Sequence, residues 1–183
     1  MAINFRPLKR TDENYSNVIE LYRDAFPGAE HIPSFLLRYK LRDGKKGFDV
    51  VYDDDQWVGL NYYTLCRGIV FVHFLAVPES RRSEGFGSKI IDSMCLIHSE
   101  KKIVLNIKAL DDRADNYQQR VSRKAFYQKN GFSSSGFYVD EPDGRYEMLV
   151  RGGNINKKEV AAIYKILLGS IVGFFIRPKV VAI

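Results

Sequence analysis

Residues 77–88, with the sequence VPESRRSEGFGS, contain glycine and arginine residues at a spacing that could bind a phosphate group. A run of apolar residues ends at this segment, and a helical pattern begins at Gly85. Gly85 and Gly87 leave space for a ligand to approach the backbone, and the first N–H groups of a helix attract anions. Arg82 could add a bidentate, charge-assisted contact to a phosphate. Because loops of this kind also occur as plain tight turns, the segment predicts either a phosphate site or a turn that only opens a helix.

Hydrophobic periodicity predicts the elements that would position this loop. Strands are expected at residues 3–8, 48–52, 57–65, 69–77, 103–110, 136–139 and 146–150. Helices are expected from a cap at Thr11 to Phe26, and at 34–41, 85–97 and 118–130. An antiparallel meander followed by helical crossovers indicates an α/β (α+β) fold, with a mixed, mostly antiparallel sheet flanked by helices.

The end of the chain differs from the rest in charge and pattern. Residues 151–183 hold six basic side chains and one acidic side chain, so residues 1–150 are nearly neutral although the whole chain carries a net charge of +6. Apolar residues recur at helical spacing from Val160 to Ile171, which predicts an amphipathic helix. We therefore divide the chain into a domain at 1–150 and a C-terminal appendage at 151–183. The appendage is expected to pack on the domain or on a second subunit of a homodimer. The flanking basic residues leave attachment to an anionic membrane as an alternative, but the apolar run is too short to span a bilayer.

The composition limits the classes of function. With 183 residues, 45% of them hydrophobic and 27% charged, the chain can form one folded domain with a substantial core. Its main part lacks the basic stripe with interleaved aromatic residues that is typical of nucleic-acid binding, so no nucleic-acid partner is expected. Cys66 and Cys95 have neither CxxC spacing nor neighbouring histidines, so we expect buried side chains there and neither a metal site nor a disulfide framework. No signal-peptide pattern precedes the first strand, which predicts a cytoplasmic protein.

Three segments carry a family resemblance. HFLAV (73–77), RSEGFG (82–87) and FYQKNGF (126–132) stand in the order and spacing found in the GCN5-related N-acetyltransferases, the GNAT family, which the chain resembles. In architecture the resemblance extends over residues 1–150. It implies the GNAT fold and transfer of the acetyl group of acetyl-CoA, as co-substrate, to a primary amine. The amine, on a small molecule or a peptide, would attack the thioester directly, with no covalent enzyme intermediate.

The resemblance also implies a position for each part of acetyl-CoA. The backbone of Leu75, Ala76 and Val77, on a strand that opens away from its neighbour, would pair with the pantetheine amides. The pyrophosphate would lie in a loop made of Arg82, Ser83, Glu84, Gly85, Phe86, Gly87 and Ser88. Tyr127 would lie near the sulfur atom and protonate the leaving thiolate. Alternatively, the FYQKNGF segment would only pack as the end of an amphipathic helix.

The implied reaction needs a base, because an amine is mostly protonated at neutral pH and only its free base attacks. His73 is the best candidate, since some members of the family place a histidine at this point of the strand. A histidine ordinarily titrates near neutral pH, which suits a proton acceptor. The alternative is a structural histidine packed between sheet and helix.

Several positions depart from the family pattern. Asn106 stands where many members have a glutamate as base, and Arg120 stands where an asparagine often contacts CoA. Ser83 and Glu84 replace a glycine and a basic residue of the loop, and a carboxylate beside a pyrophosphate is unfavourable unless it points to solvent. These departures keep open a second function, a catalytically weak acyl-CoA-binding or regulatory module of the same fold.

Acidic loop residues near the expected acceptor site have two interpretations. Glu30, Asp140, Glu141 and Asp143, with His31, could attract a cationic amine by focusing the electrostatic potential. The alternative, which the usual composition of loops favours, is that they are ordinary solvated turn residues.

Overall fold

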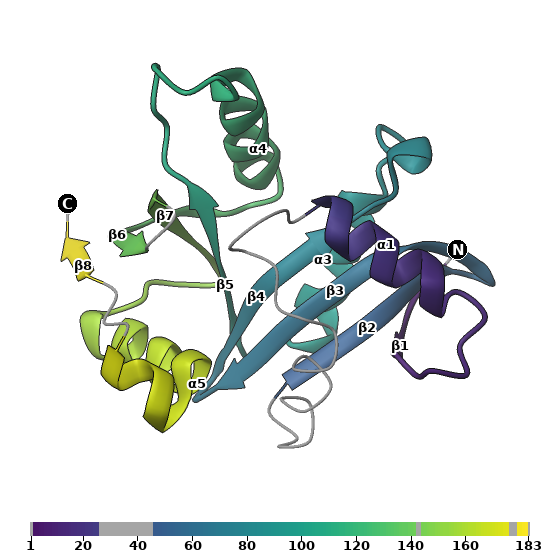
Figure 1. Cartoon of the computed structure of the whole chain (residues 1–183), viewed down its shortest axis with the longest axis horizontal. Helices are drawn as coiled ribbons and strands as arrows, with labels where there is room; N and C mark the ends of the chain where they lie inside the picture. Colours follow the sequence, from purple (N-terminus) through teal and green to yellow (C-terminus); the bar gives the residue numbers. More distant parts are fainter. Residues whose placement is uncertain (1, 26–45, 142–143, 176–178, 183) are drawn as a thin grey trace. The chain divides into compact units, whose positions relative to one another are not determined.

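The computed structural model describes residues 2–25, 46–141, 144–175 and 179–182 (Figure 1). The strands are β1 (Ile3–Pro7), β2 (Lys46–Asp53), β3 (Gln56–Cys66), β4 (Ile69–Ala76), β5 (Lys102–Lys108), β6 (Ser133–Glu141), β7 (Gly144–Arg151) and β8 (Lys179–Ala182). The helices are α1 (Tyr15–Ala25), α3 (Phe86–Ile97), α4 (Tyr117–Lys129) and α5 (Lys157–Phe175), with a short 3-10 helix, η3, at Glu79–Arg81. The described strands form one sheet in the order β1-β2-β3-β4-β5-β7-β6-β8. The pairs β1/β2, β2/β3, β5/β7, β6/β7 and β6/β8 are antiparallel.

The chain divides into two compact units. Unit 1 comprises Met1–Leu65 and Val72–Ser99, and unit 2 comprises Cys66–Phe71 and Glu100–Ile183. Strand β4 contributes to both, because its first three residues belong to unit 2 and the rest to unit 1. Each unit has a hydrophobic core of its own.

Unit 1 has a helix on each face of its strands (Figure 1). On one face, Val18, Leu21 and Tyr22 of α1 recur at helical spacing and are buried. They pack with residues that alternate along the strands, namely Phe48, Val50, Tyr52, Leu60, Tyr62, Phe74 and Ala76. On the other face, Met94 of α3 lies with Asn61 and Tyr63 of β3. Because side chains alternate along β3, one side of the strand faces α1 and the other side faces α3.

Unit 2 is also covered on two faces. Val160, Ile163 and Tyr164 of α5 are buried in a core that includes Val104, Val139, Met148 and Val150. The neighbour of Met148, Glu147, points to the other face, where its Oε2 lies 2.7 Å from Lys124 Nζ of α4. The buried positions of α5 thus make the C-terminal residues part of the core of unit 2.

The strand and helix order agrees with the mixed, mostly antiparallel fold expected from the sequence, with two differences. The cap expected at Thr11 is wrong, because α1 begins at Tyr15 and its first hydrogen bond runs from the Val18 N–H to the Asn14 carbonyl. The Asn14 N–H donates to Asp12 Oδ1 at 2.9 Å, so a side-chain turn precedes the helix. Strand β8, which pairs with β6, was not expected.

The helix expected at 34–41 lies outside the described residues. No helix in the part of the chain that the structure describes combines the length and apolar character needed to cross a bilayer. Cys66 is buried, Cys95 is half-buried, and neither forms a disulfide.

Candidate functional site

The loop between β4 and α3 presents a row of backbone N–H groups. The Arg81 and Arg82 N–H groups donate to the Pro78 and Glu79 carbonyls of η3, at 2.9 and 3.1 Å. The next backbone bond runs from the Lys89 N–H to the Gly85 carbonyl at 3.1 Å. The N–H groups of residues 83–88 therefore have no acceptor within the described part of the chain. We call residues 82–88 the anion loop. Free N–H groups that lead into a helix N-terminus form a site for a phosphate oxygen.

The conformation of the anion loop depends on two left-handed residues. Gly85 precedes α3 with φ 84°, and a Cβ built on it would meet no atom within 4 Å. The space beside Gly85 is therefore open to a ligand. Ser83 has φ 67°, a conformation that is disfavoured for residues other than glycine. A glycine would adopt this conformation without strain, and Ser83 adopts it here.

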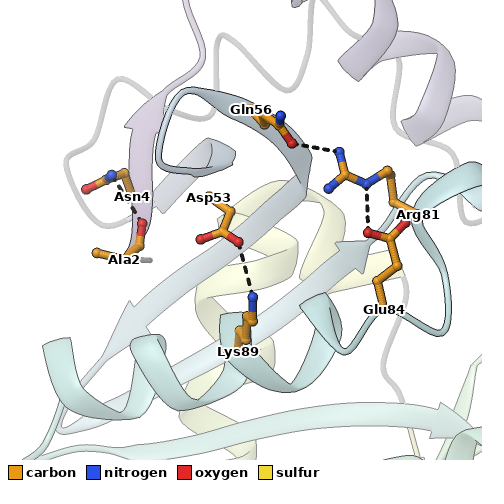
Figure 2. Close-up of polar contacts among 7 residues, drawn as sticks. All are labelled: Ala2, Asn4, Asp53, Gln56, Arg81, Glu84 and Lys89. Atoms are coloured by element: carbon orange, nitrogen blue, oxygen red, sulfur yellow. Dashed lines mark hydrogen bonds and ion pairs between the residues drawn. The ribbon is translucent and has the colours of Figure 1, made fainter.

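Arg81 fixes the anion loop to the β2–β3 turn (Figure 2). Its Nε donates to Glu84 Oε2 at 3.2 Å and its Nη1 donates to Gln56 Oε1 at 3.3 Å. The guanidinium also lies 4.6 Å from the centroid of the Phe86 ring. Arg82, in contrast, is exposed and pairs with no described side chain. The two neighbouring arginines thus differ: Arg81 holds the loop, and Arg82 is available to a phosphate.

A second ion pair connects the same turn to the first turns of α3 (Figure 2). Lys89 Nζ lies 3.1 Å from Asp53 Oδ2 and 4.9 Å from the centroid of the Phe86 ring. Asp53 Oδ1 is buried and has no partner in the described part of the chain. The sequence interpretation missed both contacts, although Lys89 stands one helical turn after Phe86 and Asp53 begins an acidic hairpin turn.

The strand before the anion loop holds the residues expected at the pantetheine. Ala76 is buried, while Leu75 and Val77 are half-buried. The backbone of Gly59 lies directly against the Ala76 carbonyl, because a Cβ built on Gly59 would collide with that oxygen. Gly59 therefore permits the close approach of β3 to the end of β4.

His73 lies two residues before Leu75 and is half-buried in unit 1. Its Nε2 forms a hydrogen bond of 2.8 Å with Thr64 Oγ1. Its ring centroid lies 4.7 Å from that of Tyr62. These contacts fix the orientation of the imidazole. Whichever ring nitrogen carries the proton, Nε2 is the atom that is engaged with Thr64.

Tyr127 lies near the end of α4 in unit 2 and is held by aromatic contacts. The centroids of Phe126 and Phe132 lie 5.2 and 5.5 Å from that of Tyr127, both edge-on. The chain turns at Gly131, with φ 79°, and the Phe132 N–H donates to the Tyr127 carbonyl at 3.1 Å. Burial raises the pKa of the Tyr127 hydroxyl, against a smaller opposing effect of Arg123. Tyr127 therefore keeps its proton at neutral pH and can act only as a donor or a neutral acceptor.

Arg120, which stands where the family often has a CoA-contacting asparagine, connects α4 to β5. Its Nε donates to Asn116 Oδ1 at 2.8 Å and its Nη1 donates to the Ala109 carbonyl at 2.9 Å. Both bonds lie within unit 2. The side chain thus holds the start of α4 through its Nε and Nη1 groups.

Asn106, which replaces the usual strand glutamate, belongs to a hydrogen-bonded cluster with α5. Its Nδ2 donates to the Tyr164 hydroxyl at 2.6 Å, and that hydroxyl donates to Glu141 Oε1 at 2.8 Å. Burial and the Glu141 charge raise the pKa of Tyr164. Asp140 is paired with Arg145, through bonds of 2.7 and 3.2 Å. Of the acidic residues expected near an acceptor, Asp140 and Glu141 are thus already engaged, while Glu30, His31 and Asp143 lie outside the described residues.

Comparison with solved structures identifies the fold. A Bacteroides thetaiotaomicron protein assigned to the GNAT family of acetyltransferases superposes with a TM-score of 0.72, at 23% identity over 92% of this chain and 97% of that chain. An aminoglycoside 6'-N-acetyltransferase in complex with coenzyme A gives 0.61, at 17% identity over 85% and 100% of the two chains. Arabidopsis thaliana Naa50, in complex with a bisubstrate analogue, gives 0.58, at 15% identity over 84% and 100%.

The protein therefore has the fold of the GCN5-related N-acetyltransferases, as the three sequence segments indicated. No family model matches the chain. No curated protein matches it in sequence either.

Proposed function

We propose that the protein is an N-acetyltransferase that transfers the acetyl group of acetyl-CoA to a primary amine. The observation that carries this proposal is the row of free N–H groups at residues 83–88, followed by the N-terminus of α3. These groups fit a pyrophosphate, because Gly85 leaves open space and Arg82 adds an unpaired positive charge. The structural neighbours support the choice, since their names include acetyltransferases of aminoglycosides and spermidine and one is bound to coenzyme A.

Acetyl-CoA supplies the acetyl group as a thioester that an amine can attack directly. The anion loop would bind the pyrophosphate, and the backbone of residues 75–77 would position the pantetheine. His73, oriented by Thr64, would accept the proton that the attacking amine loses. Tyr127, which burial keeps protonated at neutral pH, would donate its proton to the leaving thiolate.

Calorimetric titration with acetyl-CoA, together with detection of free thiol in the presence of amines, tests this proposal. Gly85→Glu places a carboxylate and a strained residue in the anion loop and should abolish binding. Gly68→Glu is a matched control, because Gly68 also has a left-handed φ of 79° and open space around it, but lies in the β3–β4 turn. Binding by the parent and by Gly68→Glu, with loss in Gly85→Glu, would support the site. A folded parent that does not bind acetyl-CoA would refute it.

A second candidate function is that of an acyl-CoA-binding or regulatory module with weak turnover. The engagement of Asn106 with Tyr164 favours it, because no carboxylate stands at that point of β5. The same two measurements separate the candidates. Tight acetyl-CoA binding without thiol release from any amine tested would favour the binding module, whereas thiol release that requires His73 and Tyr127 would favour the enzyme.

A further inference from the structure

Unit 1 contains a cavity of about 70 Å³ between the C-terminal half of α3 and the sheet face opposite α1. Its apolar lining comes from Phe5 of β1 and from Met94 and Ile97 of α3. Ile97 is 59% exposed, so the cavity reaches the surface beside it. The volume is about twice the share of one water molecule in the liquid, about 30 Å³. The cavity can therefore hold the end group of a small molecule.

Two buried hydrogen-bond acceptors line the same cavity. Asp49 and Asn61 face each other across β2 and β3, and their exposed fractions are only 7% and 1%. Asn61 Oδ1 has no hydrogen-bond partner in the described part of the chain. Asn61 Oδ1 thus lacks the donor that a buried acceptor requires, and the Asp49 carboxyl beside it is desolvated by burial.

The electrostatic surroundings of the cavity favour a cation. Among its lining residues, the titratable groups that face Asp49 are Tyr63 and His98, whose rings lie 5.8 Å apart. Burial and, to a smaller extent, the Asp49 charge raise the pKa of the Tyr63 hydroxyl, so Tyr63 remains neutral. His98 caps the C-terminal end of α3, where the helix dipole contributes partial negative charge. Burial raises the pKa of Asp49 to about 6, which still leaves it mostly ionised above neutral pH.

We propose that this cavity binds the ammonium group of a small primary amine, with its N–H groups donating to Asp49 and Asn61. The short apolar part of the ligand would lie against Phe5, Met94 and Ile97, and the Tyr63 ring would add a cation–π contact. A hard metal ion does not fit, because it needs six or more oxygen ligands and the lining is mainly apolar.

This site is distinct from the anion loop. The two lie toward opposite ends of α3, a helix of 12 residues and thus about 18 Å long. The proposal therefore adds an amine-binding site to the proposed acetyl transfer and does not depend on it. A Gly85→Glu protein, which should lose acetyl-CoA, should still bind the amine at this cavity.

Propylammonium chloride is the probe, with propan-1-ol as the neutral analogue of the same shape and sodium chloride as the ionic control. We expect saturable binding of propylammonium that raises the Tm, and no comparable effect of either control. Asp49→Asn should weaken propylammonium binding by about tenfold or more, because it removes a charge-assisted hydrogen bond. Asp55→Asn is the matched control, since Asp55 is exposed in the neighbouring turn and, among the described residues, pairs with Arg6.

Three results would overturn the proposal: no saturable binding of propylammonium, equally tight binding of propan-1-ol, or undiminished binding by a folded Asp49→Asn protein. If Asp49→Asn does not fold, carbon-13 NMR of the Asp49 carboxyl in the parent gives a second measurement. Propylammonium at the cavity should move the titration of that carboxyl to lower pH, whereas sodium chloride at equal ionic strength should not. An unchanged titration would show that water alone occupies the cavity.

Discussion

Arg81 Nε lies 3.2 Å from Glu84 Oε2, so the arginine that precedes the anion loop neutralises the carboxylate inside it. Without this pair, Glu84 would repel a pyrophosphate bound a few ångströms away. The pair also explains how the loop can hold an acidic residue where the resembled family usually has a basic one.

Replacing Glu84 with glutamine should raise the affinity for acetyl-CoA severalfold. The change removes a negative charge near the phosphates and frees Arg81 to attract them. Because the Glu84 side chain is 46% exposed, the lost ion pair should cost less than about 1 kcal/mol of stability. Calorimetry at low and high salt measures the effect, with the exposed Glu79→Gln as control. Equal affinities of parent and Glu84→Gln would show that Glu84 does not face the ligand.

The two neighbouring arginines should respond differently to truncation. Arg82→Ala should weaken acetyl-CoA binding by about ten- to a hundredfold with little change in Tm, because it removes a charge-assisted contact from an exposed side chain. Arg81→Ala should instead lower the Tm, since it breaks the contacts with Glu84, Gln56 and the Phe86 ring. Paired measurement of Kd and Tm in both variants checks this. Weakened acetyl-CoA binding in Arg81→Ala, together with a lowered Tm in Arg82→Ala, would assign the phosphate contact to Arg81.

Tyr127→Phe should reduce kcat by about a hundredfold at saturating acetyl-CoA, because it removes the proposed proton donor. The Kd for acetyl-CoA and the Tm should stay near those of the parent, since the Tyr127 ring packs against Phe126 and Phe132 and phenylalanine keeps these ring contacts. Tyr117→Phe on the same helix is the matched control. Because burial raises the pKa of Tyr127, its ionisation should not limit the activity of the parent near neutral pH. An unchanged kcat in Tyr127→Phe would contradict the role.

The succession of strands along the chain could be predicted from the sequence because the strands are runs rich in β-branched and aromatic residues, most of them buried over much of their length. Strand β8 was missed because its four residues follow a helical apolar pattern and its pairing with β6 is long-range. The cap of α1 was placed three residues too early because Thr11 and Asn14 are both acceptable cap residues, and only the hydrogen bonds distinguish them.

The anion loop was the part of the candidate site that local sequence could predict, since its function depends on backbone conformation and on residues close together in the chain. The partners of Arg81, Lys89 and His73 lie on other strands, so sequence spacing could not indicate them. The cavity at Asp49 was also missed, because a single acid in a strand gives no sign that its cross-strand neighbour is an unpaired asparagine.

The start of α5 provides a test of how firmly the C-terminal helix is held. Asn156 Oδ1 accepts the N–H groups of Lys158 and Glu159, and Glu159 Oε2 accepts the Asn156 N–H, which together form a capping box. Lys102 Nζ also donates to Glu159 Oε1 at 2.7 Å. Asn156→Ala should lower the free energy of unfolding by about 1 kcal/mol, and the exposed Asn154→Ala should not. Equal stability of both variants, measured by urea unfolding, would mean that α5 contributes little to the core of unit 2.

The buried carboxyl of Asp49 should make stability depend on pH in a direction opposite to that of a salt-bridged acid. Its pKa is raised from 3.8 to about 6 by burial, so the folded protein holds the proton more tightly than the unfolded chain does. The resulting stabilisation is complete below pH 3.8 and is lost as the pH rises through 6, with a total of up to about 3 kcal/mol. Asp49→Asn, which cannot ionise, should therefore be more stable than the parent by about 1–3 kcal/mol above pH 7 and equal to it near pH 4. Urea unfolding at both pH values measures this, with the exposed Asp55→Asn as control. If the free energy of unfolding of the parent and of Asp49→Asn had the same pH dependence, a donor would already compensate the Asp49 carboxylate. The cavity would then have no uncompensated charge to bind a cation.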